Sequence, residues 1–372
     1  MSHTHSTLEP PRRLLFGPGP TQVHPRVYEA MGKPIVGHLD PFFFEVYEEI
    51  RRDLRPVFGT KNPFVQVISG TGSAGMETVL ANFVEPNQKL AVFTAGYFAE
   101  RLVEMGRRHG ANVVCSSKPW GETFTEAEAA AFIDKEKPHA VAFVHAETST
   151  GARQDLAAIT RPAHAAKAIT IVDCVTSLGA MPINIDASGV DVAFSCTQKG
   201  LSCPPGLSPI TVSPDAVERL RARKAPCPIW YLDLKLLLDY YEGAHRYHHT
   251  APITAFYALR EGLALAREEG IEARFARHQS CHDEFVKRIE AAGLEMFIDD
   301  DARRIVNINT LKVPAGVDDL KARKALLEKY DIDIAGGFGP LAGKIFRIGV
   351  MGPLATPDNV ELLTGALSEC IK

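Results

Sequence analysis

Between residues 64 and 225, short apolar runs alternate with segments that have a helical pattern of hydrophobic positions. Helical patterns begin at Ala74 and at Phe98 and recur near residues 125–136 and 155–167. The apolar runs are FVQVIS, KLAVFT, ANVVCSS, HAVAFVHAE, AITIVDCV, DVAFSCT and LSPITVS. Strands that are apolar on both faces and alternate with helices are typical of a mainly parallel sheet covered on both sides. The pattern therefore predicts a large α/β domain.

The pattern changes in the last third of the chain. Residues 226–252 are rich in aromatic residues and prolines, and a long helical pattern follows from Ile253 into the 280s, with an expected interruption near Gly270. Beyond it, the runs LEMFI, IVNINTLKV and KIFRIGVM predict strands, and helical patterns lie near residues 317–330 and 357–371. We therefore expect a short N-terminal arm (1–20), a large domain (21–269) and a small C-terminal α+β domain (270–372).

Composition and charge narrow the function classes. The chain has 372 residues, 45% hydrophobic and 23% charged, which argues against a disordered or fibrous protein. There are 41 Lys and Arg residues against 45 Asp and Glu residues. No long block of one sign stands out, so we expect neither nucleic acid nor a membrane surface as a partner. The seven cysteines contain no CxxC pair, and the first twenty residues lack a secretory apolar core. We therefore expect a cytoplasmic protein.

A glycine-rich turn follows the first apolar run. It reads Gly70-Thr71-Gly72-Ser73-Ala74-Gly75, and its backbone N–H groups at the start of a helix could hold a phosphate. A dinucleotide site also requires an acidic residue at the end of the next strand, but that strand ends in Thr94-Ala95-Gly96. A plain tight turn is the alternative. Phosphate binding without a dinucleotide is the interpretation that we favour.

Two charged residues follow other predicted strands. Asp173 ends the run that begins at Ala168, at the edge of the sheet where α/β proteins bind ligands, although such residues often only cap a helix. Lys199 comes shortly after the run Asp191–Phe194, where a solvated surface lysine is the ordinary alternative. Together with the glycine-rich turn, they supply what pyridoxal 5′-phosphate (PLP) needs: an amine for a Schiff base, an acid for the pyridinium nitrogen and an anion site.

The order and spacing of several motifs resemble one family along nearly the whole chain. The chain resembles the class V aminotransferases of fold type I, and within them the alanine–glyoxylate and serine–pyruvate enzymes. This resemblance implies a mainly parallel seven-stranded sheet in the large domain. The motifs are Phe16-Gly17-Pro18-Gly19-Pro20, Ser69-Gly70-Thr71-Gly72, Val172-Asp173-Cys174-Val175-Thr176-Ser177, Gln198-Lys199, Pro204-Pro205-Gly206, Tyr247-His248-His249-Thr250, Gly336-Gly337-Phe338-Gly339-Pro340 and Phe346-Arg347-Ile348-Gly349.

The resemblance implies roles for individual residues around the cofactor ring. Lys199 would form the Schiff base, and Asp173 would pair with the pyridine nitrogen in a charge-assisted hydrogen bond worth roughly 1.5–3 kcal/mol. Phe98 would stack on the ring where the family commonly has Trp, and Val175 would pack on the opposite face. Thr148 would lie near the ring hydroxyl, where the family often has Ser.

Other residues would bind the phosphate and the substrate. Arg347 would bind the substrate carboxylate, because its planar fork suits bidentate recognition, and Gly19 would line the substrate site. Tyr247 and Thr250 would reach the phosphate from the neighbouring subunit, which would make the homodimer obligatory. Within the same chain, the resemblance assigns the phosphate to Thr71, Gly72, Ser73 and Gln198.

The histidines at positions 245, 248 and 249 could alternatively form a metal cluster. No cysteine and no second carboxylate group stands near them in the sequence, and the resemblance explains Tyr-His-His-Thr without a metal. We therefore expect no metal at this segment.

The predicted reaction is a ping-pong transamination from alanine or serine to glyoxylate or pyruvate. Class V enzymes that use 2-aminoethylphosphonate with pyruvate, or aspartate with glyoxylate, are alternatives. A cysteine desulfurase needs a mobile thiolate, but beyond residue 227 only Cys281 and Cys370 are available and neither lies in a suitable predicted loop. A non-catalytic vitamin-B6-binding protein would not need the substrate-binding arginine. Arg347 is present, so the enzyme is favoured. A nicotinamide-dependent oxidoreductase would leave Lys199 unexplained.

Overall fold

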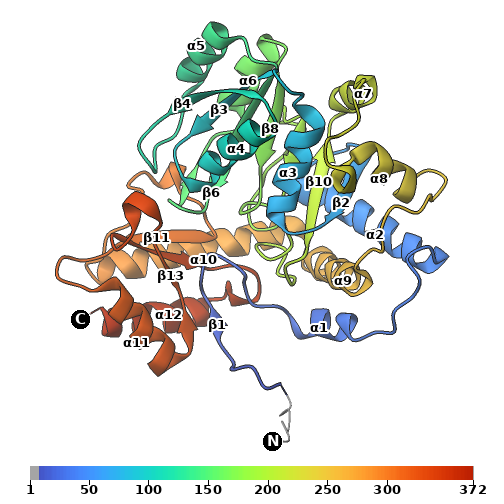
Figure 1. Cartoon of the computed structure of the whole chain (residues 1–372). Helices are drawn as coiled ribbons and strands as arrows, with labels where there is room; N and C mark the ends of the chain where they lie inside the picture. Colours follow the sequence, from blue (N-terminus) through green and yellow to red (C-terminus); the bar gives the residue numbers. More distant parts are fainter. Residues whose placement is uncertain (1–7, 372) are drawn as a thin grey trace, which may run out of the picture.

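A seven-stranded sheet forms the centre of the larger part of the molecule in the computed structural model, which describes residues 8–371 (Figure 1). Strand β10 is antiparallel to both of its neighbours, and the other neighbouring pairs are parallel. The mainly parallel, seven-stranded sheet is therefore confirmed. In spatial order, the strands are Phe64–Ser69 (β2), Leu207–Val212 (β10), Val192–Phe194 (β9), Ile169–Asp173 (β8), Ala140–Val144 (β5), Lys89–Thr94 (β3) and Asn112–Ser117 (β4).

Helices pack on this sheet, and several begin at clear local signals. The Asp40 side chain accepts the N–H of Phe42 ahead of a proline at the start of α2, and Thr125 forms a capping box with Glu128 at α5. The helices of this part are Pro25–Met31 (α1), Pro41–Phe58 (α2), Gly72–Phe83 (α3), Tyr97–Arg108 (α4), Glu126–Glu136 (α5), Ala157–Ala165 (α6), Pro214–Ala222 (α7), Leu234–Tyr241 (α8) and Ile253–Glu269 (α9). A small hairpin, Ala146–Glu147 (β6) with Ala152–Arg153 (β7), follows β5.

A second, smaller sheet lies in the C-terminal part, drawn in orange and red in Figure 1. Its strands, in spatial order, are Ile308–Lys312 (β11), Ile345–Gly349 (β14) and Ala335–Gly336 (β13). The helices beside it are Ile271–Ala291 (α10), Asp319–Tyr330 (α11) and Pro357–Cys370 (α12). The expected strand at LEMFI is wrong: Met296 forms only an isolated bridge with Leu311, and within the run only Met296 and Ile298 are buried.

The N-terminal segment joins the smaller part. Leu14–Leu15 (β1) pairs with Ile332–Asp333 (β12), and the fully buried Phe16 packs in the same hydrophobic core as Phe285 and Phe346. A separate core fills the space around the large sheet. The helical pattern is interrupted at Gly270, which separates α9 from α10 with a φ of +85°. From these two cores, we propose that the large and small domains divide near Gly270.

Two further features concern the setting of the protein. Within residues 8–371, none of the helices has the length and hydrophobicity needed to cross a bilayer. The seven cysteines are all unpaired.

Candidate active site

A cavity of about 190 Å³ opens where β8 and β9 end and α3 and α4 begin. This position follows from the fold, because open α/β sheets bind ligands at the carboxyl ends of their parallel strands. The structure brings most of the predicted site residues together here, in spite of their separation in sequence. Those that line the cavity are Gly19, Thr71, Gly72, Ser73, Phe98, Thr148, Asp173, Val175, Gln198 and Lys199.

Lys199 lies in the loop after β9 with its side chain buried. Its Nζ donates a hydrogen bond to the Pro18 carbonyl, so the N-terminal segment lies directly against the amine. Burial lowers the pKa of Lys199, and the positive charge of Arg347 lowers it further. A larger fraction of this amine is therefore neutral, as a nucleophile or a base requires.

Asp173 is the last residue of β8 and is also buried. Its Oδ1 accepts the Val175 N–H at 2.8 Å. Burial raises the pKa of Asp173 to about 7, even though that hydrogen bond and the charges of Lys199 and Arg101 lower it. Asp173 forms no ion pair with any residue in the range 8–371. A cationic group in the cavity would keep this carboxylate ionised.

The N-terminus of α3 forms an anion site at one end of the cavity. The N–H groups of Ala74 and Gly75 both donate to the Thr71 carbonyl. Those of Gly72 and Ser73 lie at the start of the helix, where backbone N–H groups have no acceptor within the helix. Close packing surrounds this turn: a Cβ on Gly72 would lie 3.1 Å from a Val175 methyl group. The side chain of Gln198 lines the same cavity, and its buried amide oxygen has no hydrogen-bond partner.

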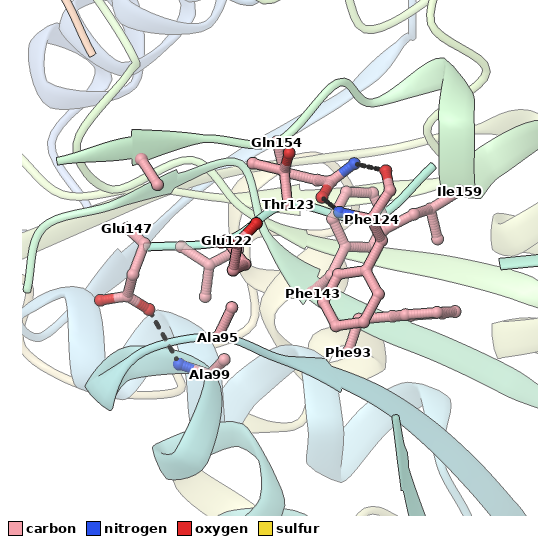
Figure 2. A pocket seen from close by; sticks show the side chains of 12 residues that line it. Phe93, Ala95, Ala99, Glu122, Thr123, Phe124, Phe143, Glu147, Gln154 and Ile159 are labelled. Carbon is pink, nitrogen blue, oxygen red and sulfur yellow. Dashed lines mark hydrogen bonds between the residues drawn. The ribbon is translucent and has the colours of Figure 1, made fainter. Parts of the chain in front are cut away.

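Glu147 fixes the helix that carries Phe98. This buried carboxylate accepts the N–H groups of Phe98 and Ala99, both at 3.2 Å, and Figure 2 shows it pointing at the first turn of α4. The positive end of the helix dipole attracts an anion at this position. Burial raises the pKa of Glu147, while hydrogen bonds from Ser149 and from α4 oppose the rise. The neighbouring Thr148 contacts Thr176 through its hydroxyl group.

Arg347, on β14, does not line the cavity itself. Its Nε donates to the Gly336 carbonyl at 2.7 Å, and its guanidinium carbon lies 3.8 Å from the centre of the Phe338 ring. Burial lowers the pKa of Arg347 to about 10, although the charge of Glu147 raises it, so the side chain remains positive at neutral pH. Its positive charge lowers the pKa of Lys199.

Tyr247 and Thr250 lie outside this chain's own cavity. Both are exposed, and the Tyr247 ring lies 5.1 Å from that of His38. The two histidines between them, His248 and His249, contact each other through their Nδ1 atoms at 2.9 Å. Within residues 8–371, no three metal-ligating side chains converge.

A family model described as aminotransferase class-V matches residues 13–347. The chain belongs to the class V aminotransferases. The sequence of this aminotransferase is 44% identical to that of an alanine–glyoxylate aminotransferase from Nostoc sp. The crystal structure of that protein matches this one with a TM-score of 0.97, over 99% of this chain and 98% of that one. It is 37% identical to the alanine–glyoxylate aminotransferase of Callithrix jacchus, over 97% of this chain and 88% of the relative. A ureidoglycine–glyoxylate aminotransferase from Bacillus subtilis is 39% identical, with a TM-score of 0.95 over 98% of this chain and 94% of that structure.

PLP is the cofactor of the class V aminotransferases, and the cavity fits it. The unpaired N–H groups at α3 and the Gln198 amide suit the phosphate. Asp173, a buried carboxylate without a cation, suits the pyridinium nitrogen, and the Lys199 amine suits the aldehyde. The phosphate, the ring nitrogen and the aldehyde of the cofactor therefore each have a chemically suitable group in the cavity of this aminotransferase.

Two residues of the aminotransferase site escape prediction from the sequence. Arg101 lines the cavity and Glu147 anchors α4 from 49 residues beyond Phe98 in the chain. For Arg101 a signal exists, since it lies one helical turn after Phe98 and therefore on the same face. For Glu147 the sequence offers none, because an acidic residue after a strand has many uses.

Proposed function

We propose that this aminotransferase transfers the amino group of alanine or serine to glyoxylate, with pyruvate as an alternative acceptor, by a ping-pong mechanism. The observation that carries the proposal is 44% identity over nearly the whole chain to a protein named alanine–glyoxylate aminotransferase. The buried Arg347 supports a substrate with a carboxylate.

The roles of the residues follow from their surroundings. Bound PLP supplies an electron sink for the bonds at the substrate Cα. Lys199 is the candidate to accept the Cα proton at Nζ, because burial lowers its pKa. Asp173 holds the ring nitrogen in its protonated state. Arg347, oriented by the Gly336 carbonyl and the Phe338 ring, holds the substrate carboxylate with its remaining N–H groups.

A second donor is supported by a separate observation. The relative from Bacillus subtilis is named for ureidoglycine and glyoxylate, and its similarity to this chain is close to that of the alanine–glyoxylate enzymes. Both names share glyoxylate and differ in the donor. Glyoxylate is therefore the better supported half of the proposed reaction.

A substrate panel tests the proposal. Alanine, serine, aspartate and ureidoglycine are each combined with glyoxylate, pyruvate and 2-oxoglutarate, and product formation is measured by chromatography. We expect the highest kcat/KM with glyoxylate and with alanine or serine. Turnover confined to 2-oxoglutarate would refute the proposal, and a preference for ureidoglycine would favour the second donor. The Lys199→Ala variant is the control for non-enzymatic transfer.

We also infer that the active protein is a cytoplasmic homodimer with shared sites. The exposure of Tyr247 and Thr250 outside their own cavity supports their use by a partner copy, and seven unpaired cysteines support a reducing compartment. Mixed dimers of Lys199→Ala and Tyr247→Ala subunits test the shared site. If Tyr247 serves the partner, one site of each mixed dimer is intact, so activity returns on mixing. If mixing restores nothing, the shared site is refuted.

A further inference from the structure

Arg101 is a cation in the cavity to which neither the resemblance nor the proposed function assigns a role. It lies in the second turn of α4, half-buried, and lines the same cavity as Lys199 and Asp173. Within residues 8–371 it forms no ion pair with a carboxylate. A guanidinium that is partly withdrawn from water without an anionic partner has lost solvation that a ligand could replace.

The contacts of Arg101 fix where its charge lies. Its Nη1 donates to Ser73 Oγ at 3.0 Å, which ties it to the first turn of α3. Its guanidinium carbon also lies 4.9 Å from the centre of the Phe98 ring and 5.4 Å from that of Tyr97. Cation–π contacts of this kind hold the guanidinium in place over the rings. The side chain is therefore preorganised at the α3 end of the cavity.

The rest of the anion site carries no formal charge. The turn offers backbone N–H groups and the hydroxyl groups of Thr71 and Ser73, and Gln198 offers a neutral amide. The helix terminus contributes roughly half of a positive charge, whereas a phosphate monoester carries about −1.5 to −2 at neutral pH. Lys199 is hydrogen-bonded to the Pro18 carbonyl, away from this turn. Arg101 is the cation that is bonded to the turn itself.

We propose that Arg101 binds the phosphate of the cofactor and supplies the positive charge that the α3 turn lacks. This inference deepens the proposed function and rests on its cofactor site, but not on the identity of the donor or acceptor.

Two other roles for Arg101 lead to different results. A residue that recognises a second carboxylate of the substrate would act on the substrate beside Lys199 and Gly19, and would change KM without changing cofactor affinity. A residue that only supports the Phe98 ring would act on any ligand that has the pyridine ring, with or without a phosphate.

The test compares two ligands that differ only in the phosphate. Cofactor-free wild-type protein and the Arg101→Met variant are titrated with PLP and with pyridoxal, and binding is followed by visible absorbance. We expect the Kd for PLP to rise about 10- to 100-fold, as for loss of a charged hydrogen bond, and the Kd for pyridoxal to change less than twofold. Arg101→Lys, which keeps the charge, should recover part of the PLP affinity.

Three results would overturn the inference. Equal losses for PLP and pyridoxal would reduce Arg101 to a support for Phe98, and unchanged affinity for both would remove it from the cofactor site. A raised KM for the amino acid with unchanged PLP affinity would assign it to the substrate. The melting temperatures of the cofactor-free variants show whether the fold itself has changed. Ser73→Ala, which removes the hydrogen bond to Arg101 but keeps the guanidinium, is measured beside them. The titrations with PLP and pyridoxal need no amino-acid substrate. They therefore test the inference even if the proposed donor and acceptor are wrong.

Discussion

Substitution of Gly19 by Ala would test how closely the N-terminal segment determines the position of Lys199. Gly19 has a φ of +113°, which L side chains rarely adopt. An added Cβ would lie 2.5 Å from Cδ, 2.7 Å from Cε and 3.0 Å from Nζ of Lys199. Carbon atoms in contact are about 3.5–4.0 Å apart, so the lysine side chain has to move by about 1 Å.

The two effects of this substitution have separate magnitudes. Backbone strain at a positive φ costs about 1–3 kcal/mol of stability. The displaced atoms belong to a flexible side chain, so the clash moves the amine more than it unfolds the protein. A misplacement of about 1 Å is enough to cost on the order of 100-fold in rate. We therefore expect a larger loss in transamination than in the free energy of unfolding.

Gly17→Ala is the matched control, since it lies in the same motif. A Cβ there would meet its nearest atom, the Asp333 carbonyl oxygen, only at 4.0 Å, so we expect a change within about 0.5 kcal/mol. Denaturant unfolding gives the stability of both variants, and borohydride reduction followed by peptide mapping gives the fraction of Lys199 that carries cofactor. If Gly19→Ala matches Gly17→Ala in both measurements, the N-terminal segment does not position the lysine.

Three further predictions concern buried charges. Because burial raises the pKa of Asp173 to about 7, the folded cofactor-free protein holds a proton that the unfolded chain releases near pH 4, so its free energy of unfolding should fall as pH rises from about 4 to 7. Asp173→Asn should flatten that decrease in denaturant titrations, and an unchanged slope would contradict the assignment. Arg347→Lys keeps the charge but loses the fork, so KM for the amino acid should rise about 10-fold or more with cofactor binding intact; steady-state kinetics and PLP titration decide this, and an unchanged KM argues against the role. Glu147→Gln should lower the free energy of unfolding by about 1–2 kcal/mol, because it replaces one of the two oxygens that accept N–H groups from α4 and Ser149 with an NH2 group that cannot accept. The exposed Glu104→Gln on the same helix should change it by less than about 0.5 kcal/mol, and equal effects would deny Glu147 a special role.

The strands show what periodicity can and cannot predict. The runs that became β2, β3, β5 and β8 are buried on both faces, so nearly every residue is apolar and the pattern is unambiguous. LEMFI is also mostly apolar, but only Leu294 and Met296 pack in or against the small hydrophobic core, Glu295 is exposed, and the run makes only one bridge to a neighbouring strand. Hydrophobicity reports burial, and pairing depends on which backbone lies alongside.

Some helices begin at local signals that hydrophobic periodicity does not use. Helix α2 begins at Asp40-Pro41 and has one buried face along its length, and α8 begins at Asp233 within the segment 226–252 that is rich in aromatic residues and prolines. Both starts are of the kind that capping rules recognise. In contrast, no local pattern announces the pairing of β1 with β12, since each strand has only two residues.

The sequence by itself determined that three groups of the cofactor site would meet at one edge of the sheet. Parallel strands end at one edge of a sheet, so Asp173, Lys199 and the turn before α3 had to come together once the strands were recognised. Only the tertiary structure decided that Pro18 and Gly19 close over the lysine, that Glu147 anchors α4 and that Arg101 reaches Ser73. The physical reason is that the hydrophobic pattern of a strand depends only on consecutive residues. The desolvation and the local charge of a buried group depend on every segment that packs around it.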